Sequence, residues 1–265
     1  MQIIDTHAHL DHLENLPEAL QAAHETGVAA IIAVGVDGAA NKRNLTIKQQ
    51  TFHPKIFVAL GIHPGNIAAS EVEGALEFIR AHVREAAAIG EIGLDYWYKW
   101  VRKDEAKKKE QREVFQKQLQ LAKEFDLPIV IHSRGAWRDC LTMTREMNIP
   151  KALFHWYSGP VDILQEILAS GYYVSTSPSV AYSPQSREAM AAAPIERTLI
   201  ETDSPVYYGE KNTGFSATPK DVWRTLKAYA QLKNISEEQA LPILNQNAKD
   251  FFALNDLSLA EEKVV

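Results

Sequence analysis

The chain has a single cysteine, Cys140, among its 265 residues, so it cannot form an internal disulfide. It contains no apolar run long enough to cross a bilayer, and its first residues lack the basic start and cleavage site of a secretory signal. These absences argue against a disulfide-stabilised secreted protein and predict a cytoplasmic protein without a membrane span. We expect Cys140 to be a buried apolar residue.

The sequence also lacks an excess of basic residues. Its formal net charge is -6 and its pI is about 5.9, whereas proteins held to nucleic acid by overall charge are basic. One segment, residues 99–112, has seven basic and three acidic residues and a net charge of +4. A polyanion would therefore have to be bound locally.

Short apolar or β-branched runs recur along the chain, each followed by turn residues and a longer segment with helical periodicity. The eight predicted strands are Gln2–Thr6, Ala29–Gly35, Ile56–Gly61, Ala88–Ile92, Pro128–Ile131, Ala152–His155, Tyr172–Ser175 and Thr198–Glu201. Strict alternation of strands and helices predicts a parallel sheet, and 265 residues suit one α/β domain, a (β/α)8 TIM barrel. An open doubly wound sheet is the alternative.

The helices predicted between these strands include Leu16–Thr26, Glu71–Glu85, Asp104–Phe125, Trp137–Met147 and Val161–Ala169. Two more are expected after the last strand: Pro219–Leu232, capped by Thr218, and Glu237–Phe252, which could break at Pro242. Ser236 and Gln239 form a capping-box pattern before the second. We expect residues 1–265 to form a single domain with a frayed tail at 256–265.

Six metal-ligand residue types fall at or just after the ends of predicted strands one, four, five, six and eight. They are His7, His9, Glu91, His132, His155 and Asp203. In a parallel barrel these ends share one face, which is the face on which barrel enzymes carry their active sites. Any one of these histidines alone fits a structural role, but four imidazoles beside two carboxylates would be costly to bury without a cation.

Six ligands exceed the set of about three that one open catalytic site uses, so two cations are expected to share them. A pair about 3.5–4 Å apart, bridged by one carboxylate, would activate a hydroxide for ester hydrolysis. The mixed imidazole and carboxylate set suits zinc, manganese, iron or cobalt better than magnesium alone. We therefore expect two divalent metal cations, with the choice among Zn, Mn and Mg left open.

Six short motifs follow one another along nearly the whole chain. They are Ile4-Asp5-Thr6-His7-Ala8-His9-Leu10-Asp11, Gly61-Ile62-His63-Pro64, Gly90-Glu91-Ile92-Gly93-Leu94-Asp95, Ile131-His132-Ser133-Arg134, Phe154-His155-Trp156-Tyr157-Ser158-Gly159 and Glu201-Thr202-Asp203-Ser204-Pro205. In this order they resemble the motif series of the TatD family of metal-dependent deoxyribonucleases. The resemblance implies an amidohydrolase-type TIM barrel that cleaves phosphodiesters at DNA ends with two divalent cations.

Carried over by position, the resemblance implies a role for each matching residue. One metal would be held by His7, His9, Glu91 and Asp203, and the other by Glu91, His132 and His155. Glu91 would bridge the two, and Asp203 would also orient the nucleophilic water or take its proton. His63 and Arg134 would contact the substrate phosphate. Considered without the family, His63 could be a turn histidine and Arg134 a structural ion-pair partner.

Residues near the candidate ligands, where the substrate would bind, depart from the family pattern, although the candidate ligands themselves match it. Gly135 stands where many members have an acidic residue, and Trp156 and Tyr157 stand where Cys and Phe are common. Many members also carry an arginine-rich stretch after Asp203, which residues 211–219 do not. A metal-dependent hydrolase is therefore better supported than a particular substrate.

The segment after the fourth predicted strand, residues 96–103, is aromatic and basic. It contains Tyr96, Trp97, Tyr98, Lys99, Trp100, Arg102 and Lys103. Such a loop could stack bases and neutralise phosphates, as single-strand binders do. A packed lid or a subunit contact explains it equally well.

We predict a divalent-metal-dependent hydrolase, a deoxyribonuclease or phosphodiesterase of 3′–5′ exonuclease type acting on DNA, with RNA and internal cleavage left open. One alternative is an ester or amide hydrolase such as an aminoacyl-tRNA deacylase, because the same hydroxide can attack a carbonyl. The other is a non-catalytic binding protein on the same barrel, which would have little reason to keep an open metal site. The sequence leaves the oligomeric state open.

Overall fold

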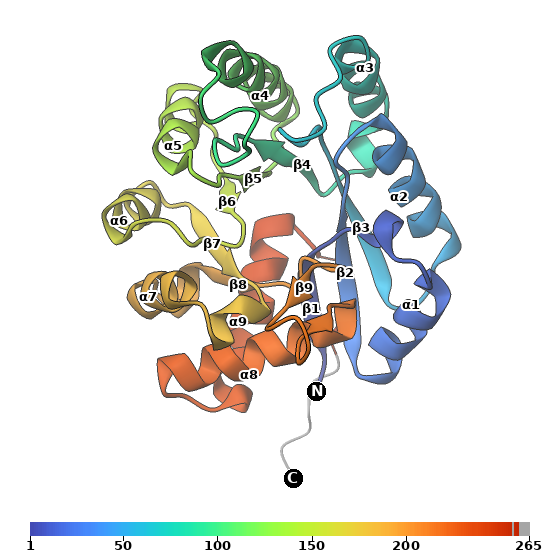
Figure 1. The fold of residues 1–265 in the computed structure, drawn as a ribbon. Helices are drawn as coiled ribbons and strands as arrows, with labels where there is room; N and C mark the ends of the chain where they lie inside the picture. Colours follow the sequence, from blue (N-terminus) through green and yellow to red (C-terminus); the bar gives the residue numbers. More distant parts are fainter. Residues whose placement is uncertain (256, 260–265) are drawn as a thin grey trace.

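The computed structural model describes residues 1–255 and 257–259 and contains a barrel of eight parallel strands (Figure 1). The strands are β1 (Ile3–Ala8), β2 (Val28–Val34), β3 (Lys55–Leu60), β4 (Ala88–Gly93), β5 (Ile129–His132), β6 (Ala152–Phe154), β7 (Tyr173–Thr176) and β8 (Thr198–Ile200). Each strand pairs with the next along the chain. The predicted TIM barrel is confirmed, and this order excludes the open doubly wound sheet.

A short seam between β1 and β8 closes the barrel. The backbone N–H of Asp203 donates to the carbonyl oxygen of His7 at 2.9 Å, and the N–H of His9 donates to the carbonyl oxygen of Ser204 at 2.8 Å. The Thr6 hydroxyl adds a 2.8 Å bond to the carbonyl oxygen of Ile200. The seam therefore passes through three of the predicted metal ligands.

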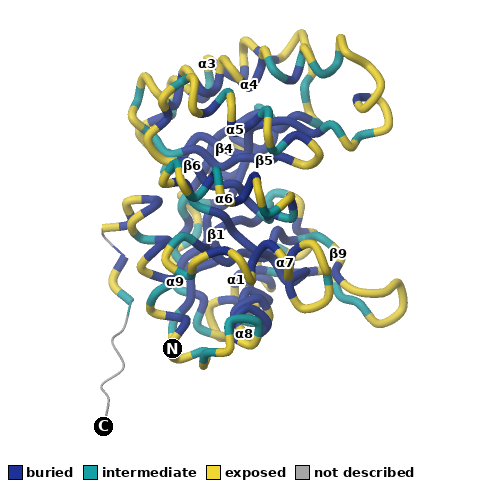
Figure 2. Tube along the Cα trace, turned by 90° about the vertical axis from the view of Figure 1, so that its left-hand side faces the viewer, coloured by how far each residue is buried: buried dark blue, intermediate teal, exposed yellow. Residues whose placement is uncertain are grey.

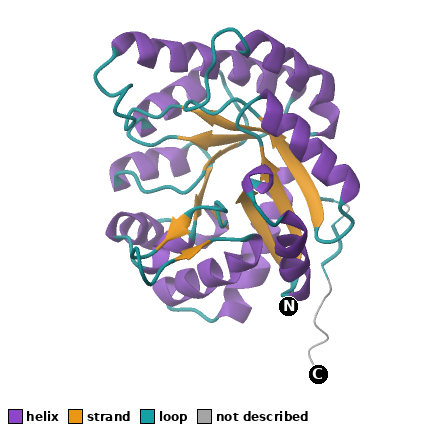
Figure 3. Ribbon diagram, turned by 45° about the vertical axis from the view of Figure 1, so that its right-hand side comes forward, coloured by secondary structure: helices purple, strands orange, loops and turns teal. Residues whose placement is uncertain are grey.

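Helices surround the strands on the outside of the barrel (Figures 1 and 3). The helices are α1 (Leu16–Glu25), α2 (Gly38–Gln50), α3 (Val72–His82), α4 (Glu105–Phe125), α5 (Trp137–Glu146), α6 (Val161–Ala169), α7 (Pro184–Ala192), α8 (Val222–Lys233) and α9 (Glu237–Phe252). A two-stranded hairpin, β9 (Tyr207–Tyr208) and β10 (Phe215–Ser216), follows β8. All seven predicted helices are present, while α2 and α7 were not predicted.

The predicted break at Pro242 is wrong, because α9 runs unbroken through it. Pro242 lies on the exposed side of the helix, and so does Glu238, whose carbonyl oxygen loses its helical partner there and can be hydrated instead. The predicted capping box is confirmed, since the N–H of Gln239 donates to the Ser236 hydroxyl and the N–H of Ser236 to the Gln239 side chain.

Buried residues follow the strands, whereas exposed residues lie on the outer helices (Figure 2). Because successive side chains of a strand point to opposite faces, neighbouring strand residues belong to two different apolar clusters. Ile3 and Ile31 pack in the cluster between the strands and the helices, whereas Ile4 and Ile32 pack in a second cluster made mostly of strand residues. Phe251, Phe252, Leu254 and Leu257 pack into this second cluster. One end of the barrel is thus filled by α9 and the residues after it.

Of the tail predicted to fray, residues 256 and 260–265 lie outside the described residues. Cys140 is fully buried, as predicted, and burial raises the pKa of its thiol. Within the part of the chain that the structure describes, no helix is long and apolar enough to span a membrane.

Candidate metal centre

All six predicted ligand residues meet at the carboxyl-terminal end of the barrel, opposite the end filled by α9. Five of them line a cavity of about 740 Å³, namely His9, Glu91, His132, His155 and Asp203. His7 lies in β1 with no exposed surface. Its ring stacks on that of His155 with centroids 4.0 Å apart.

Glu91 occupies the centre of the group. Its Oε2 atom lies 3.5 Å from Nε2 of His7 and 3.6 Å from Nε2 of His9. Its Oε1 atom lies 2.8 Å from Nδ1 of His132 and 2.7 Å from Nε2 of His155. One carboxylate oxygen therefore faces His7 and His9 at the end of β1, and the other faces His132 and His155 at the ends of β5 and β6.

Gly93 permits the close approach of β4 to β5 at this point. Its φ of +132° is rare for residues with a side chain, and a Cβ atom there would lie 2.1 Å from the carbonyl oxygen of His132. A glycine two residues after Glu91 therefore lets the strand carry the carboxylate up to His132.

Asp203 completes the β1 side of the group. Its Oδ1 atom lies 3.4 Å from Nε2 of His7 and 3.2 Å from Nε2 of His9, so these three residues offer ligand atoms within 4.8 Å of one another. Burial would raise the pKa of Asp203, but His9 and His7 lower it to about 2. The side chain is therefore ionised.

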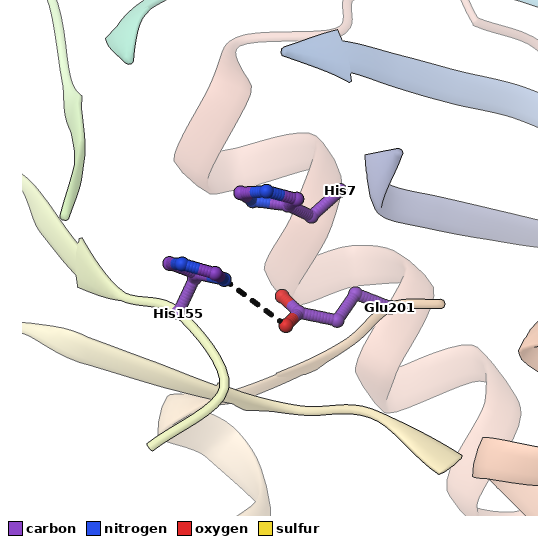
Figure 4. Close-up of side chains that lie close together, drawn as sticks. All are labelled: His7, His155 and Glu201. Carbon is purple, nitrogen blue, oxygen red and sulfur yellow. Dashed lines mark hydrogen bonds and ion pairs between the residues drawn. The ribbon is translucent and has the colours of Figure 1, made fainter. Parts of the chain in front are cut away.

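Two buried carboxylates that received no role from the sequence lie behind the histidines. Glu201 accepts from Nδ1 of His155 at 3.3 Å and from the Ser175 hydroxyl at 2.5 Å, and Figure 4 shows it beside the stacked rings of His7 and His155. Asp95 contacts Nε2 of His132 at 2.9 Å. Such outer carboxylates orient ligand imidazoles in metal sites. In the sequence, the signal for these two carboxylates was that Asp95 ends one of the six motifs and Glu201 begins another.

Asp95 also organises the neighbouring elements. The Oδ2 atom that contacts His132 accepts from Nε of Arg134 at 2.9 Å, and Oδ1 accepts from the backbone N–H groups of Trp97 at 2.8 Å and Tyr98 at 3.2 Å. The carboxylate has no exposed surface. One buried charge therefore joins a candidate metal ligand, the arginine and the aromatic loop.

His63 and Arg134 both line the cavity. Nδ1 of His63 accepts from the backbone N–H of Gly65 at 2.9 Å, and burial lowers the pKa of His63 to about 3. The neutral ring therefore carries its proton on Nε2, which is 3.6 Å from Oε1 of Glu91. Arg134 does form an ion pair, with Asp95, yet its side chain is 48% exposed, so it can still donate into the cavity.

The chemistry of this donor set fits a cation. Several buried polar atoms have no hydrogen-bond partner: both ring nitrogens of His7, Nδ1 of His9 and Oδ1 of Asp203. Burial would lower the pKa of His9, but Asp203 and Glu91 raise it to about 8. Burial would likewise raise the pKa of Glu91, but His155 and His63 hold it well below its usual value. Positive charge is favoured at this position.

The aromatic and basic loop divides into two parts. Trp97 and Tyr98 line the cavity, while Trp100 stacks on Tyr98 with centroids 5.4 Å apart. Lys99, Arg102 and Lys103 are exposed and do not line it. In α4, Lys107 and Lys108 are paired with Glu110 and Glu105. The cluster of positive charge is therefore outside the cavity and partly neutralised.

Comparison with known proteins agrees with this geometry. The family model described as TatD related DNase matches residues 4–253. The chain belongs to this family. The human deoxyribonuclease TATDN3 is 29% identical over 262 residues, covering 94% of each chain. The Bacillus subtilis protein named uncharacterized metal-dependent hydrolase YabD is 32% identical over 263 residues, covering 96% of this chain and 100% of that protein.

Solved structures of family members have the same fold. The crystal structure of YjjV, a TatD homologue from Escherichia coli, superimposes with a TM-score of 0.84 at 25% identity, covering 95% of this chain and 98% of that one. A TatD family hydrolase from Entamoeba histolytica gives a TM-score of 0.81 at 22% identity, covering 95% and 98%. The chain is thus a TatD-type, metal-dependent hydrolase on a TIM barrel.

Proposed function

We propose that this TatD-family hydrolase is a two-metal phosphodiesterase that removes nucleotides from DNA ends. The observation that carries the proposal is the division of the Glu91 carboxylate between two pairs of histidines. A carboxylate that bridges two cations presents its oxygens in this way. One cation would be held by His7, His9, Asp203 and Glu91, and the other by Glu91, His132 and His155.

The residues around this position supply the remaining chemistry. Divalent cations held there would activate a water and neutralise the phosphate. Asp203 is ionised, faces the cavity and has no hydrogen-bond partner on Oδ1, so it orients the attacking water and accepts its proton. Nε2–H of His63 and the guanidinium of Arg134 donate to the phosphate oxygens. No other cationic side chain is needed to hold a single phosphodiester.

Two observations support DNA ends as the substrate. Relatives that align over nearly the whole chain are named deoxyribonucleases. The cavity of about 740 Å³ has the size of a small-molecule site, which suits one or two nucleotides of a strand end rather than a duplex.

The proposal is tested with substrates of three classes: 5′-labelled DNA and RNA strands, an aminoacyl ester and an amide, each with manganese, magnesium and zinc. We expect metal-dependent shortening of the DNA strand from its 3′ end. Turnover of the aminoacyl ester alone would assign the chain to deacylation, and turnover of none would refute catalysis. Asp203→Asn should lower kcat by about 10²–10⁴-fold while the fold is retained. Near-normal turnover of this variant with metal bound would remove Asp203 from the mechanism.

A further inference from the structure

Three tryptophans line the cavity that contains the candidate metal ligands: Trp97, Trp137 and Trp156. Trp97 and Trp156 lie on the loops after β4 and β6, and Trp137 is the first residue of α5, which follows β5. Trp156 directly follows His155, and Trp97 lies two residues after Asp95, so two of these rings adjoin the metal centre along the chain. Neither ring is part of the phosphate and metal chemistry described above.

Trp156 is held rigidly, with its polar group turned to the protein. Its indole Nε1–H donates to the Ser179 hydroxyl at 2.8 Å, and its backbone N–H donates to the Ser175 hydroxyl at 3.1 Å. The ring also packs on Tyr208, with centroids 5.4 Å apart. Because Ser179 already takes its single side-chain donor, Trp156 presents ring surface to the cavity and no hydrogen-bonding group.

Trp97 is positioned by Asp95 and by Gly135, which lies on the loop after β5. Asp95 fixes its backbone N–H, and its ring lies next to Gly135, where a Cβ atom would be 3.7 Å from Cε3 of the indole. Gly135 has a φ of +71°, a conformation that favours glycine. Trp97 remains 66% exposed at the cavity. A large apolar ring is therefore left available for a partner.

The charge of the cavity limits what that partner can be. Among the described residues that line the cavity, Arg134 is the single lysine or arginine. One fixed cation beside uncovered aromatic rings matches one phosphodiester with a flat, uncharged group next to it. It does not match a run of phosphates.

We propose that Trp97 and Trp156 form a base-binding subsite for the nucleoside adjoining the scissile phosphate. This inference rests on the proposed function and adds the group that is recognised. Recognition is by the face of the base, since the Trp156 donor is already used. The subsite therefore accepts any unpaired base and does not distinguish sequence. Stacking on one aromatic side chain contributes about 5- to 150-fold in affinity per base.

The test compares two single strands that differ only at the 3′-terminal nucleotide, which carries thymine in one and a tetrahydrofuran abasic unit in the other. Dissociation constants are measured by fluorescence anisotropy in an Asp203→Asn background, where cleavage is slow, and KM and kcat are measured in the wild-type background. We expect Trp97→Ala and Trp156→Ala each to weaken binding of the thymine strand by about 5- to 150-fold and to raise KM more than they lower kcat. Binding of the abasic strand should change by less than about twofold.

Two further variants separate stacking from general damage. Trp97→Phe keeps an aromatic face and should restore most of the affinity for the thymine strand. Trp100→Ala, from the same loop but outside the cavity lining, should leave both strands unaffected. Equal losses on the two strands, or no loss on either, would overturn the subsite, as would loss of a dimer by Trp97→Ala with unchanged kinetics. Base-dependent binding without cleavage by the wild type would refute the proposed function and leave the subsite standing.

Discussion

Replacing Asp95 by asparagine should weaken metal binding more than it weakens the fold. The buried carboxylate accepts from Nε2 of His132 and Nε of Arg134 with one oxygen, and from the N–H groups of Trp97 and Tyr98 with the other. An amide has one accepting oxygen, so it cannot serve both pairs. If its NH2 group faces His132, two donors meet, and the ring relieves this by moving its proton to Nδ1, the nitrogen that faces Glu91.

The size of the effect follows from these contacts. Losing the outer partner of a ligand histidine costs about 10- to 100-fold in metal affinity, or about 1.4–2.7 kcal/mol. Leaving buried donors unpaired should also lower the free energy of unfolding by about 1–3 kcal/mol. Manganese affinity is measured by competition with a chelator, and stability by urea unfolding in EDTA, so that the two effects are recorded separately.

A matched control lies on the same side of the barrel. Asp139 accepts from the Tyr96 hydroxyl at 2.9 Å and has no contact with His132 among those described. Because this carboxylate does not orient His132, Asp139→Asn should leave the affinity for manganese within about twofold of the wild type. A twofold change corresponds to less than about 0.5 kcal/mol. If Asp95→Asn binds manganese as the wild type does and loses only stability, the orienting role of Asp95 is wrong.

Three shorter predictions follow from the same site and core. The pKa of His9 is raised to about 8, and a metal binds the unprotonated ring, so manganese affinity should fall as the pH is lowered from 8 to 6; a flat profile would contradict this. Protein treated with EDTA should keep its far-UV circular dichroism and cooperative unfolding, because the apolar clusters form without the cations; a random-coil spectrum would show otherwise. Cys140 is buried and the pKa of its thiol is raised, so Ellman's reagent should detect no thiol in native protein and one per chain in guanidinium.

The sequence predicted the barrel because each strand is a short apolar run that ends at turn residues or at a ligand. It failed at α2 and α7, whose apolar residues are not gathered on one face, so that the helical repeat is weak. Their N-caps were readable, since Asp37 accepts from the N–H groups of Ala39 and Ala40 and Ser183 precedes Pro184. Helix caps are thus a better signal than apolar periodicity for these two helices, the least amphipathic among those described.

The candidate ligands were predictable because a parallel barrel gathers strand ends on one face. The outer carboxylates were not, because an acid at a strand end is common and its partner depends on the fold. The aromatic and basic loop shows the same limit. The turn that Asp95 imposes brings Trp97 and Tyr98 to the cavity and leaves Lys99 outside, which side-chain types alone do not reveal.

The position of the barrel seam links activity to completion of the chain. His7 and His9 are made at the start of synthesis, whereas Asp203, which pairs with the backbone of His7, is made in the last quarter. Until β8 docks, one edge of β1 is unpaired, and Asp203 has not yet joined His7 and His9, the histidines that share its side of the ligand group. A chain that ends before residue 203 therefore lacks one of the six candidate ligands, and the group is complete only after β8 and Asp203 have been made.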